Sequence, residues 1–157
     1  MKKLVSLASA AVLALCLFSG CGGGPETADF EPADAAAALL ESGAFTDILS
    51  PIDVRVAAEL YGVAVEDIAS CAVYCSTGAT AEEIAIFRCS DANVAVQLEK
   101  TARTRLESQA AAYAAGYGPE EVPKIESADV RVSGVYVSCV VSNDNAAVAQ
   151  VLDAYIK

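Results

Sequence analysis

Apolar and polar positions alternate along this chain in segments with helical and strand-like periods. Apolar residues at helical spacing predict helices over residues 34–42, 51–62, 91–115 and 145–155. Runs rich in valine, isoleucine and tyrosine predict strands over residues 68–76, 83–89, 124–132 and 135–141. The chain therefore reads as two helices followed twice by a hairpin and a helix.

Turn and capping residues support these boundaries. Gly43 and Gly62 are typical of helix C-termini. In the segment from Ser50 to Asp53, serine can cap a helix, proline suits its first position, and aspartate follows three residues after the cap. Residues 77–80 and 133–134 have the composition of hairpin turns.

This order predicts an α+β fold. Hairpins followed by helices favour a four-stranded, mainly antiparallel sheet with helices packed on one face. The segments Ser90–Val96 and Ser142–Val148 are similar at a separation of 52 positions. Two readings are open, an internal duplication and shared helix-cap chemistry, and we favour the second.

The first 21 residues have the layout of a bacterial lipoprotein signal peptide. Lys2 and Lys3 precede an apolar run over residues 4–18, which is too short for a typical membrane span of about 20 residues. Small residues then lead to Cys21, whose thiol we expect to be lipidated after cleavage before it. The alternative is an ordinary secretory signal followed by a coincidental cysteine.

Three regions follow from this interpretation. Residues 1–20 are the signal peptide, residues 21–32 a flexible tether rich in glycine, proline and acids, and residues 33–157 a single α+β domain. A tether of this length has a root-mean-square reach on the order of 20 Å. We expect an extracytoplasmic protein that is anchored to the cell membrane through lipidated Cys21.

Charge and composition exclude several classes of function. The net charge is −11, and removal of Lys2 and Lys3 leaves 8 basic against 21 acidic groups. Such a chain is a poor partner for nucleic acid. It has no histidine, so Ser-His-Asp and Cys-His catalysis and histidine metal sites are excluded. We expect no cofactor, no metal site and no enzymatic activity.

Four cysteines, Cys71, Cys75, Cys89 and Cys139, follow the signal segment and Cys21. Residues 71 and 75 on one strand lie about 13 Å apart and cannot bridge each other. A turn centred near residue 80 would place Cys71 opposite Cys89. Cys139 falls on the face with Val135, Val137 and Val141, which we take as the core face. Disulfides and buried free thiols are both open, and we favour free thiols because the spacing is not that of a compact disulfide framework.

Five side chains form the candidate interaction surface: Arg105, Gln109, Tyr113, Tyr117 and Tyr136. Gln109 lies on the apolar stripe of the long helix and needs a hydrogen-bond partner if it is buried. Tyrosines offer apolar area with a polar tip and can line a groove. The alternative roles are structural: contacts between helix and loop, and tyrosines at the rim of the core.

Acidic pairs are weaker candidates. Glu82–Glu83 and Glu120–Glu121 could attract a cation, but adjacent residues on a strand point in opposite directions, so neither pair chelates alone. Asn143–Asn145 resembles part of a calcium loop but lacks the glycine and the distant glutamate, and we interpret it as a helix cap.

Four segments of the chain share a resemblance to known sequences: Leu60–Gly62, Glu82–Arg88, Arg105–Gln109 and Gly134–Ser142. Together they resemble a lipoprotein family of Firmicutes known as domain of unknown function 4358. The resemblance covers about residues 52–154 and implies an exported, lipid-anchored domain of a Gram-positive bacterium, with no known activity. Over residues 110–118, alanines replace the bulkier and more charged residues usual in that family.

The sequence favours a protein-interaction or envelope accessory module that binds another envelope protein. A small-ligand-binding lipoprotein is the alternative, and it needs a concave pocket of a few hundred Å³. An enzyme that uses carboxylates and tyrosines is the least favoured, because it needs two carboxylates in one cleft.

Overall fold

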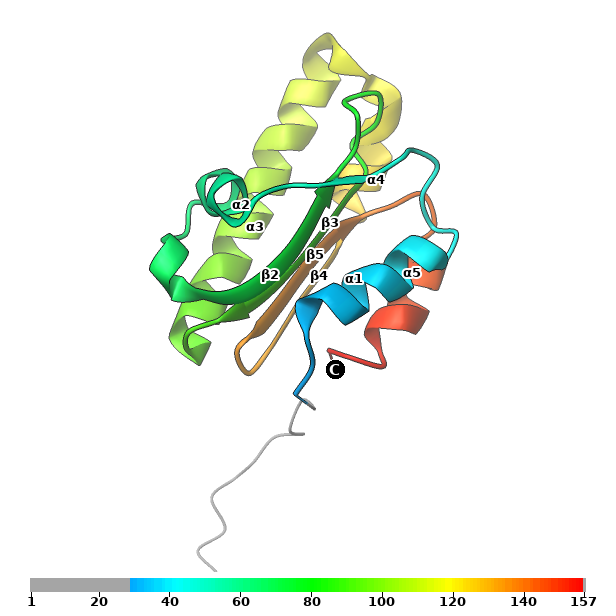
Figure 1. Ribbon diagram of the computed structural model, residues 1–157. Coiled ribbons are helices and arrows are strands. Elements are labelled where there is room, and N and C mark those ends of the chain that lie inside the picture. The colour runs from blue at the N-terminus through cyan, green and yellow to red at the C-terminus, as the bar shows by residue number, and fades with distance from the viewer. Residues whose placement is uncertain (1–28, 157) are drawn as a thin grey trace, which may run out of the picture.

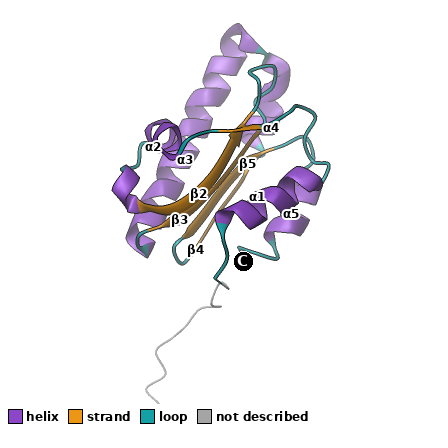
Figure 2. Ribbon diagram, viewed as in Figure 1, coloured by secondary structure: helices purple, strands orange, loops and turns teal. Residues whose placement is uncertain are grey.

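A five-stranded antiparallel sheet forms the centre of the molecule, and helices cover both of its faces (Figure 1). The computed structural model describes residues 29–156. Figure 2 shows the resulting three layers, with the strands between two groups of helices. The expected signal peptide, Cys21 and most of the expected tether lie outside the described residues.

The helices are α1 (Pro32–Glu41), α2 (Val54–Tyr61), α3 (Ala92–Ala112), α4 (Val122–Glu126) and α5 (Asn145–Leu152). Three short helical turns accompany them: η1 (Val65–Asp67), η2 (Tyr113–Tyr117) and η3 (Pro119–Glu121). The strands are β1 (Ser50–Pro51), β2 (Ile68–Cys75), β3 (Glu83–Cys89), β4 (Asp129–Ser133) and β5 (Tyr136–Val141). Their order in the sheet is β1-β2-β3-β5-β4, so β1 and β4 are the edge strands.

The sheet separates two hydrophobic cores. Helices α2, α3 and α4 cover one face, and their core contains Tyr61, Phe87, Leu98 and Cys139. Helices α1 and α5 cover the other face, and their core contains Leu39, Ile84, Ile86, Val140 and Leu152. We call these the α3-side core and the α1-side core.

The α+β class is confirmed, but the expectation of helices on one face is wrong. The reason lies in the central strands β3 and β5. Ile84 and Ile86 point into the α1-side core, whereas Ala85 and Phe87 point into the α3-side core. A strand that is apolar at both alternating sets of positions must be covered on both faces.

The sheet has five strands instead of the expected four. Ser50 and Pro51, expected to begin a helix, form edge strand β1 opposite Cys75 and Tyr74 of β2. Proline is tolerated on an edge because no partner strand needs its missing N–H. The helix cap moves to Asp53, whose side chain accepts a hydrogen bond from the Arg55 amide at 2.9 Å.

The segment 124–132, expected to be one strand, is divided between a helix and a strand. Residues up to Glu126 belong to α4, and β4 begins only at Asp129. Pro119 and Pro123 lie in the first turns of η3 and α4, where the missing N–H has no helical partner to lose. The hairpin between β4 and β5 is confirmed, with its turn at residues 134–135.

The register of β2 and β3 differs from the expected one. Cys75 faces Glu83, which centres the connection on residue 79 and places Cys71 opposite Phe87. An irregularity between Ile68 and Ser70 then leaves Cys89 opposite Ile68. The expected pairing of Cys71 with Cys89 is therefore wrong.

Helix caps account for the repeated sequence signal. Asp91 caps α3 and accepts from two amides, and Asp144 caps α5 in the same way. The two helices lie on opposite faces of the sheet, so the second hairpin and helix do not copy the first. This supports shared cap chemistry over duplication.

Candidate functional site

Helix α3 lies across the sheet, and its two flanks have different environments. One flank carries Arg105 and Tyr113 and contacts β3 and the loop after β2. The other flank carries Arg103 and Ala110 and faces α4 and β4. The first flank is filled by a buried polar cluster, and the second borders an open groove.

The buried cluster joins Glu83 on β3, Arg105 on α3 and Tyr61 on α2. Arg105 Nη2 lies 2.7 Å from Glu83 Oε2, with side-chain exposures of only 17% and 5%. The Tyr61 hydroxyl donates a short hydrogen bond to Glu83 Oε1, and the Arg105 guanidinium lies over the Tyr61 ring at 4.9 Å. The Glu83 carboxylate therefore binds side chains from both α2 and α3.

Burial determines the protonation chemistry of this cluster. Desolvation, with the nearby Cys139 and Glu83, raises the pKa of Tyr61 well above its usual value. For Arg105, desolvation acts to lower the pKa, but the charge of Glu83 outweighs it and the pKa is raised. Tyr61 is therefore neutral and Arg105 charged at physiological pH.

Two polar atoms on the same flank of α3 are buried without a partner among the described residues. They are Arg105 Nη1 and Gln109 Oε1, one helical turn apart. The sequence predicted that Gln109 would need a partner, and its carbonyl oxygen has none in the described part of the chain. Tyr113, one turn further, donates to the carbonyl of Thr80 at 3.2 Å and holds the tip of the loop after β2.

Glu82 belongs to a second buried cluster at the same end of the sheet. Its carboxylate accepts from the amides of Thr46 and Asp47 at 2.8 and 2.9 Å and from the Thr46 hydroxyl at 2.7 Å. Lys124 lies 3.5 Å from Glu82 and 2.9 Å from Glu121. Burial alone would raise the pKa of Glu82, but these hydrogen bonds and Lys124 hold it below its usual value.

These clusters explain the acidic pairs noted in the sequence. Glu82 and Glu83 are buried and point to different partners, Lys124 and Arg105. Glu121 accepts from the Ala81 amide at 3.0 Å. No group of acidic and cysteine side chains among residues 29–156 is arranged to hold a metal ion.

The open groove lies between α3, α4 and β4, and has a volume of about 520 Å³. Its floor is apolar and includes Leu106, Ile125 and Val130. One wall is formed by Ala110 and Ala111 of α3 and by Ala114 of η2. Charged side chains stand at the rim: Arg103, Glu107 and Glu126. We call this the α3–α4 groove.

The alanines of α3 and η2 leave this groove open. Larger side chains at positions 110, 111 and 114 would project into the space between α3 and α4. These positions lie in the alanine-rich segment over residues 110–118. The sequence offered this signal, but the groove needs α4, which the sequence assigned to a strand.

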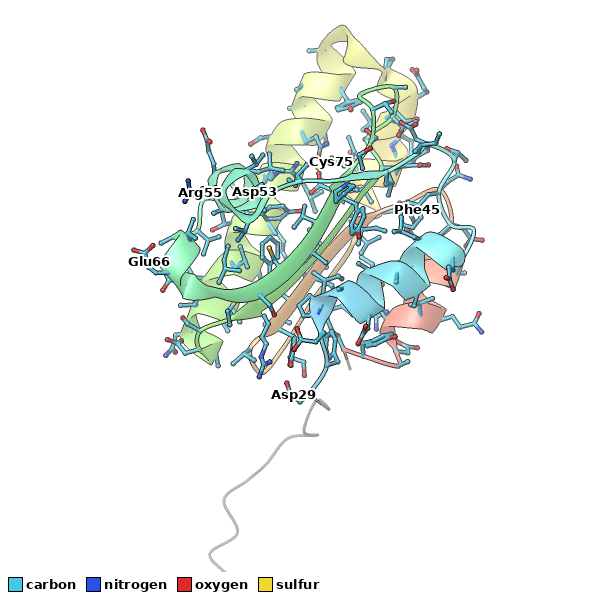
Figure 3. All side chains as sticks on the ribbon, viewed as in Figure 1. Asp29, Phe45, Asp53, Arg55, Glu66 and Cys75 are labelled. Atoms are coloured by element: carbon cyan, nitrogen blue, oxygen red, sulfur yellow. The ribbon has the colours of Figure 1, made fainter. Side chains whose placement is uncertain are left out.

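Tyr136 lies away from the other candidate residues and holds the N-terminal segment. Its ring stacks on Phe30 at a centroid distance of 4.2 Å, and its hydroxyl donates to the carboxylate of Asp29. Phe30 also contacts Tyr155 at 5.1 Å, and Arg88 lies 3.1 Å from Asp29. We call these residues the N-terminal clamp. Figure 3 shows Asp29 at the end of the molecule opposite Cys75.

The five candidate residues therefore do not form one surface. Arg105, Gln109 and Tyr113 share a flank of α3, whereas Tyr136 lies in the N-terminal clamp. Tyr117 ends η2, and its side chain lies outside the described part of the structure. Glu107, between Arg105 and Gln109 in the sequence, lines the α3–α4 groove instead.

The four cysteines in the described residues are free thiols. Cys139 lies in the α3-side core with Val137 and Val141, as expected from the alternation along β5. Desolvation raises the pKa of Cys75 and Cys89 to about 11 and that of Cys139 to about 12. Thiols with such raised pKa values are poor nucleophiles at neutral pH.

None of the helices within residues 29–156 combines the length and the apolar character that crossing a bilayer requires.

Comparison with known proteins places the chain in a family without assigning an activity. A family model described as domain of unknown function matches residues 42–142, which contain β1 to β5, α2, α3 and α4. The α3–α4 groove and both buried clusters lie within the matched residues, whereas α1, α5 and Phe30 lie outside them. No curated protein and no solved structure matches the chain. The chain belongs to the family described as domain of unknown function (DUF4358).

Proposed function

We propose that this chain is a lipid-anchored, extracytoplasmic accessory module of a bacterial cell envelope, which binds another protein through the α3–α4 groove. The anchoring part of the proposal is supported by the lysines, apolar run and small residues before Cys21. The net charge of −11 argues against nucleic acid as the partner.

The α3–α4 groove is the observation that carries the binding role. It is open, it has an apolar floor, and its walls come from three different elements. Apolar surface that is rimmed by charged side chains is typical of protein-binding sites. The charged groups that could have suggested catalysis, Glu82 and Glu83, are instead engaged by Lys124 and Arg105.

The N-terminal clamp supports a groove that faces away from the membrane. Phe30 packs with the α1-side core, whereas the groove is on the α3 side of the sheet. Asp29 follows Cys21 by eight positions in the sequence, and this stretch spans at most about 28 Å when fully extended. A lipid on Cys21 would therefore keep the clamp near the bilayer and leave the groove accessible to a partner.

Site-specific photocrosslinking in the native host tests the binding role. A photoreactive amino acid at Glu126, on the rim of the groove, is expected to form a covalent adduct with one discrete protein. The same amino acid at Val56, which is 51% exposed on α2, serves as the control and is expected to give no such adduct. The variant Ala111→Trp fills the groove and is expected to abolish the adduct at Glu126.

The anchoring role has its own test. Cells fed a labelled fatty acid are expected to label this protein, and Cys21→Ser is expected to remove the label and release the protein from the membrane fraction. An unlabelled protein, or a serine variant that is still membrane-bound, contradicts the anchoring role without affecting the groove.

Small-ligand binding is the second candidate, because a volume of about 520 Å³ lies in the range of ligand sites. Mass spectrometry of the protein purified from its host separates the two functions. A retained small molecule that Ala111→Trp removes, together with no crosslinked protein at Glu126, favours the ligand. The openness of the groove favours a protein.

A further inference from the structure

Strand β4 forms an accessible edge of the sheet beside the α3–α4 groove. All five of its residues are only partly buried, and β5 is its only neighbour among the described strands. In an antiparallel pair, alternate residues direct their backbone groups toward the partner strand and away from it. The carbonyl of Val130 accepts a hydrogen bond from Arg103, which lies outside the sheet, so Val130 and Val132 direct their backbone groups outward.

Arg103 covers this edge with a single hydrogen bond. Its Nη2 donates to the Val130 carbonyl at 3.1 Å, and its Nε donates to Glu99 at 2.6 Å. The Arg103 side chain is 54% exposed, so it is held weakly and can move away. A charged side chain over an edge prevents unwanted strand pairing, and its displacement makes the edge available.

The edge and the groove form one continuous surface. Val130 belongs to β4 and lines the groove, and Ala128 lines it just before the strand. Side chains of a strand added next to β4 would alternate, with every second one directed into the groove. The alanine wall formed by Ala110 and Ala114 leaves room there for small apolar side chains.

Charge distinguishes between the possible occupants of this surface. Without its first 20 residues the chain has 8 basic and 21 acidic groups, and Glu107 and Glu126 stand at the groove rim. A second copy would bring the same excess of negative charge, which opposes association. A basic segment would be attracted instead.

We propose that β4 accepts an additional strand from a basic partner protein, in which small apolar residues alternate and lysine or arginine flanks them. The partner's backbone replaces Arg103 at the Val130 carbonyl, and its side chains enter the α3–α4 groove. This inference rests on the proposed function, because it specifies how the same groove is occupied.

Selection from a random peptide library on the full-length, detergent-solubilised protein provides the probe. We expect peptides with alternating small apolar residues and basic flanks. The best peptide is then synthesised in two forms, methylated at alternate amides on one edge or on the other. The form whose methyl groups face β4 is expected to bind at least tenfold more weakly, and the other form is expected to bind like the parent.

Variants of the protein test the same edge from the other side. Arg103→Ala frees the Val130 carbonyl and is expected to strengthen peptide binding severalfold relative to Arg55→Ala, an exposed control with the same change in charge. Val132→Pro removes an outward amide and is expected to weaken binding at least tenfold, whereas Val132→Ala keeps the amide and is the matched control. Urea unfolding confirms that each variant is folded.

Several results would overturn this inference. They are selected peptides with acidic flanks or helical spacing, equal effects of the two methylated forms, weaker binding by Arg103→Ala than by Arg55→Ala, or no selected peptide. A concentration-dependent dimer that Arg103→Ala strengthens would assign the edge to a second copy. These results leave the photocrosslink at Glu126 intact, so failure of the strand-addition model can be distinguished from failure of the proposed function.

Discussion

Arg105 Nη2 lies 2.7 Å from Glu83 Oε2, and this ion pair joins the middle of α3 to the first residue of β3. The adjacent Glu82 is bound by the loop at residues 46–47 and by Lys124 of α4. Two neighbouring carboxylates therefore hold different elements against one end of the sheet.

Removing Arg105 is expected to destabilise the fold strongly. The variant Arg105→Ala leaves the Glu83 carboxylate buried at 5% exposure without its counter-charge. We expect a loss of about 3–5 kcal/mol in the free energy of unfolding, measured by urea denaturation. Arg103→Ala is the matched control on the same helix, because its partner Glu99 forms an exposed pair, and it should cost below about 1 kcal/mol. Equal losses would show that the pair does not hold α3 in place.

The Tyr61 hydroxyl is expected to contribute less than Arg105. Tyr61→Phe keeps the ring under the Arg105 guanidinium and removes one donor to Glu83. We expect a cost of about 1–3 kcal/mol at pH 7. The pKa of Tyr61 is raised in the fold, so its ionisation above pH 10 favours the unfolded chain. As pH rises above 10, the free energy of unfolding should therefore fall less in Tyr61→Phe than in the parent. A variant as stable as the parent at pH 7 would contradict this role.

Glu82 is expected to make stability depend on acidic pH. Its pKa in the fold lies below the ordinary value of 4.5, so its contribution is present above pH 4.5 and is lost as pH falls through the lowered pKa. Glu82→Gln should therefore destabilise the protein more at pH 7 than at pH 3, as measured by urea midpoints. Glu41→Gln, at an exposed position at the end of α1, is the control. Equal destabilisation at both pH values would count against an ionised Glu82.

The thiols are expected to be unreactive in the native protein and to oppose folding at alkaline pH. The pKa values of Cys75, Cys89 and Cys139 are raised to about 11, 11 and 12 from an ordinary value of 9.0. The unfolded chain therefore loses these protons first, and stability falls as pH rises from 9 toward 11. At pH 7.5, a thiol-reactive reagent should label Cys71, Cys75, Cys89 and Cys139 slowly in buffer and completely in urea. If the mass of the urea-unfolded protein increases on labelling only after reduction, the cysteines form disulfides instead.

The N-terminal clamp is expected to depend on Phe30. Phe30→Ala removes stacking on Tyr136 and the contact with Tyr155, an apolar contribution of about 1.5–3 kcal/mol if fully lost. Amide hydrogen exchange at residues 29–31 should then increase about tenfold or more, while α3 remains protected. Phe45→Ala, in a loop on the same face, should leave exchange at residues 29–31 unchanged. Unchanged exchange in Phe30→Ala would show that the polar contacts of Asp29 with Tyr136 and Arg88 hold the segment without the Phe30 ring.

Some sequence signals were local, and these were interpreted correctly. Asp91 and Asp144 cap helices by binding amides within three residues, and Gly62 ends α2 at a φ of +62° that disfavours other residues. The alternation along β5 placed Cys139 in a core. Such features depend on the nearest few residues, so periodicity and capping rules are sufficient to predict them.

Other features depended on residues that are distant in sequence. Ser50 and Pro51 became a strand because β2 offered an unpaired edge, and Ile52 then donates to the Val73 carbonyl at 2.9 Å. The residues of the predicted surface do not lie together, because Tyr136 contacts Phe30, 106 positions away, and does not lie beside Tyr113. Neither contact has a signature in the local pattern.

The sequence by itself determined the α+β class, most helices and strands, the excess of acidic groups and the absence of histidine chemistry. The tertiary structure alone decided that the sheet is covered on both faces, that Glu82 and Glu83 serve different partners, and that Ala110 and Ala111 line a groove. The physical reason is that periodicity reports how one element can bury its own apolar face. Which face meets which neighbour, and where space remains between them, depends on packing among elements that are far apart along the chain.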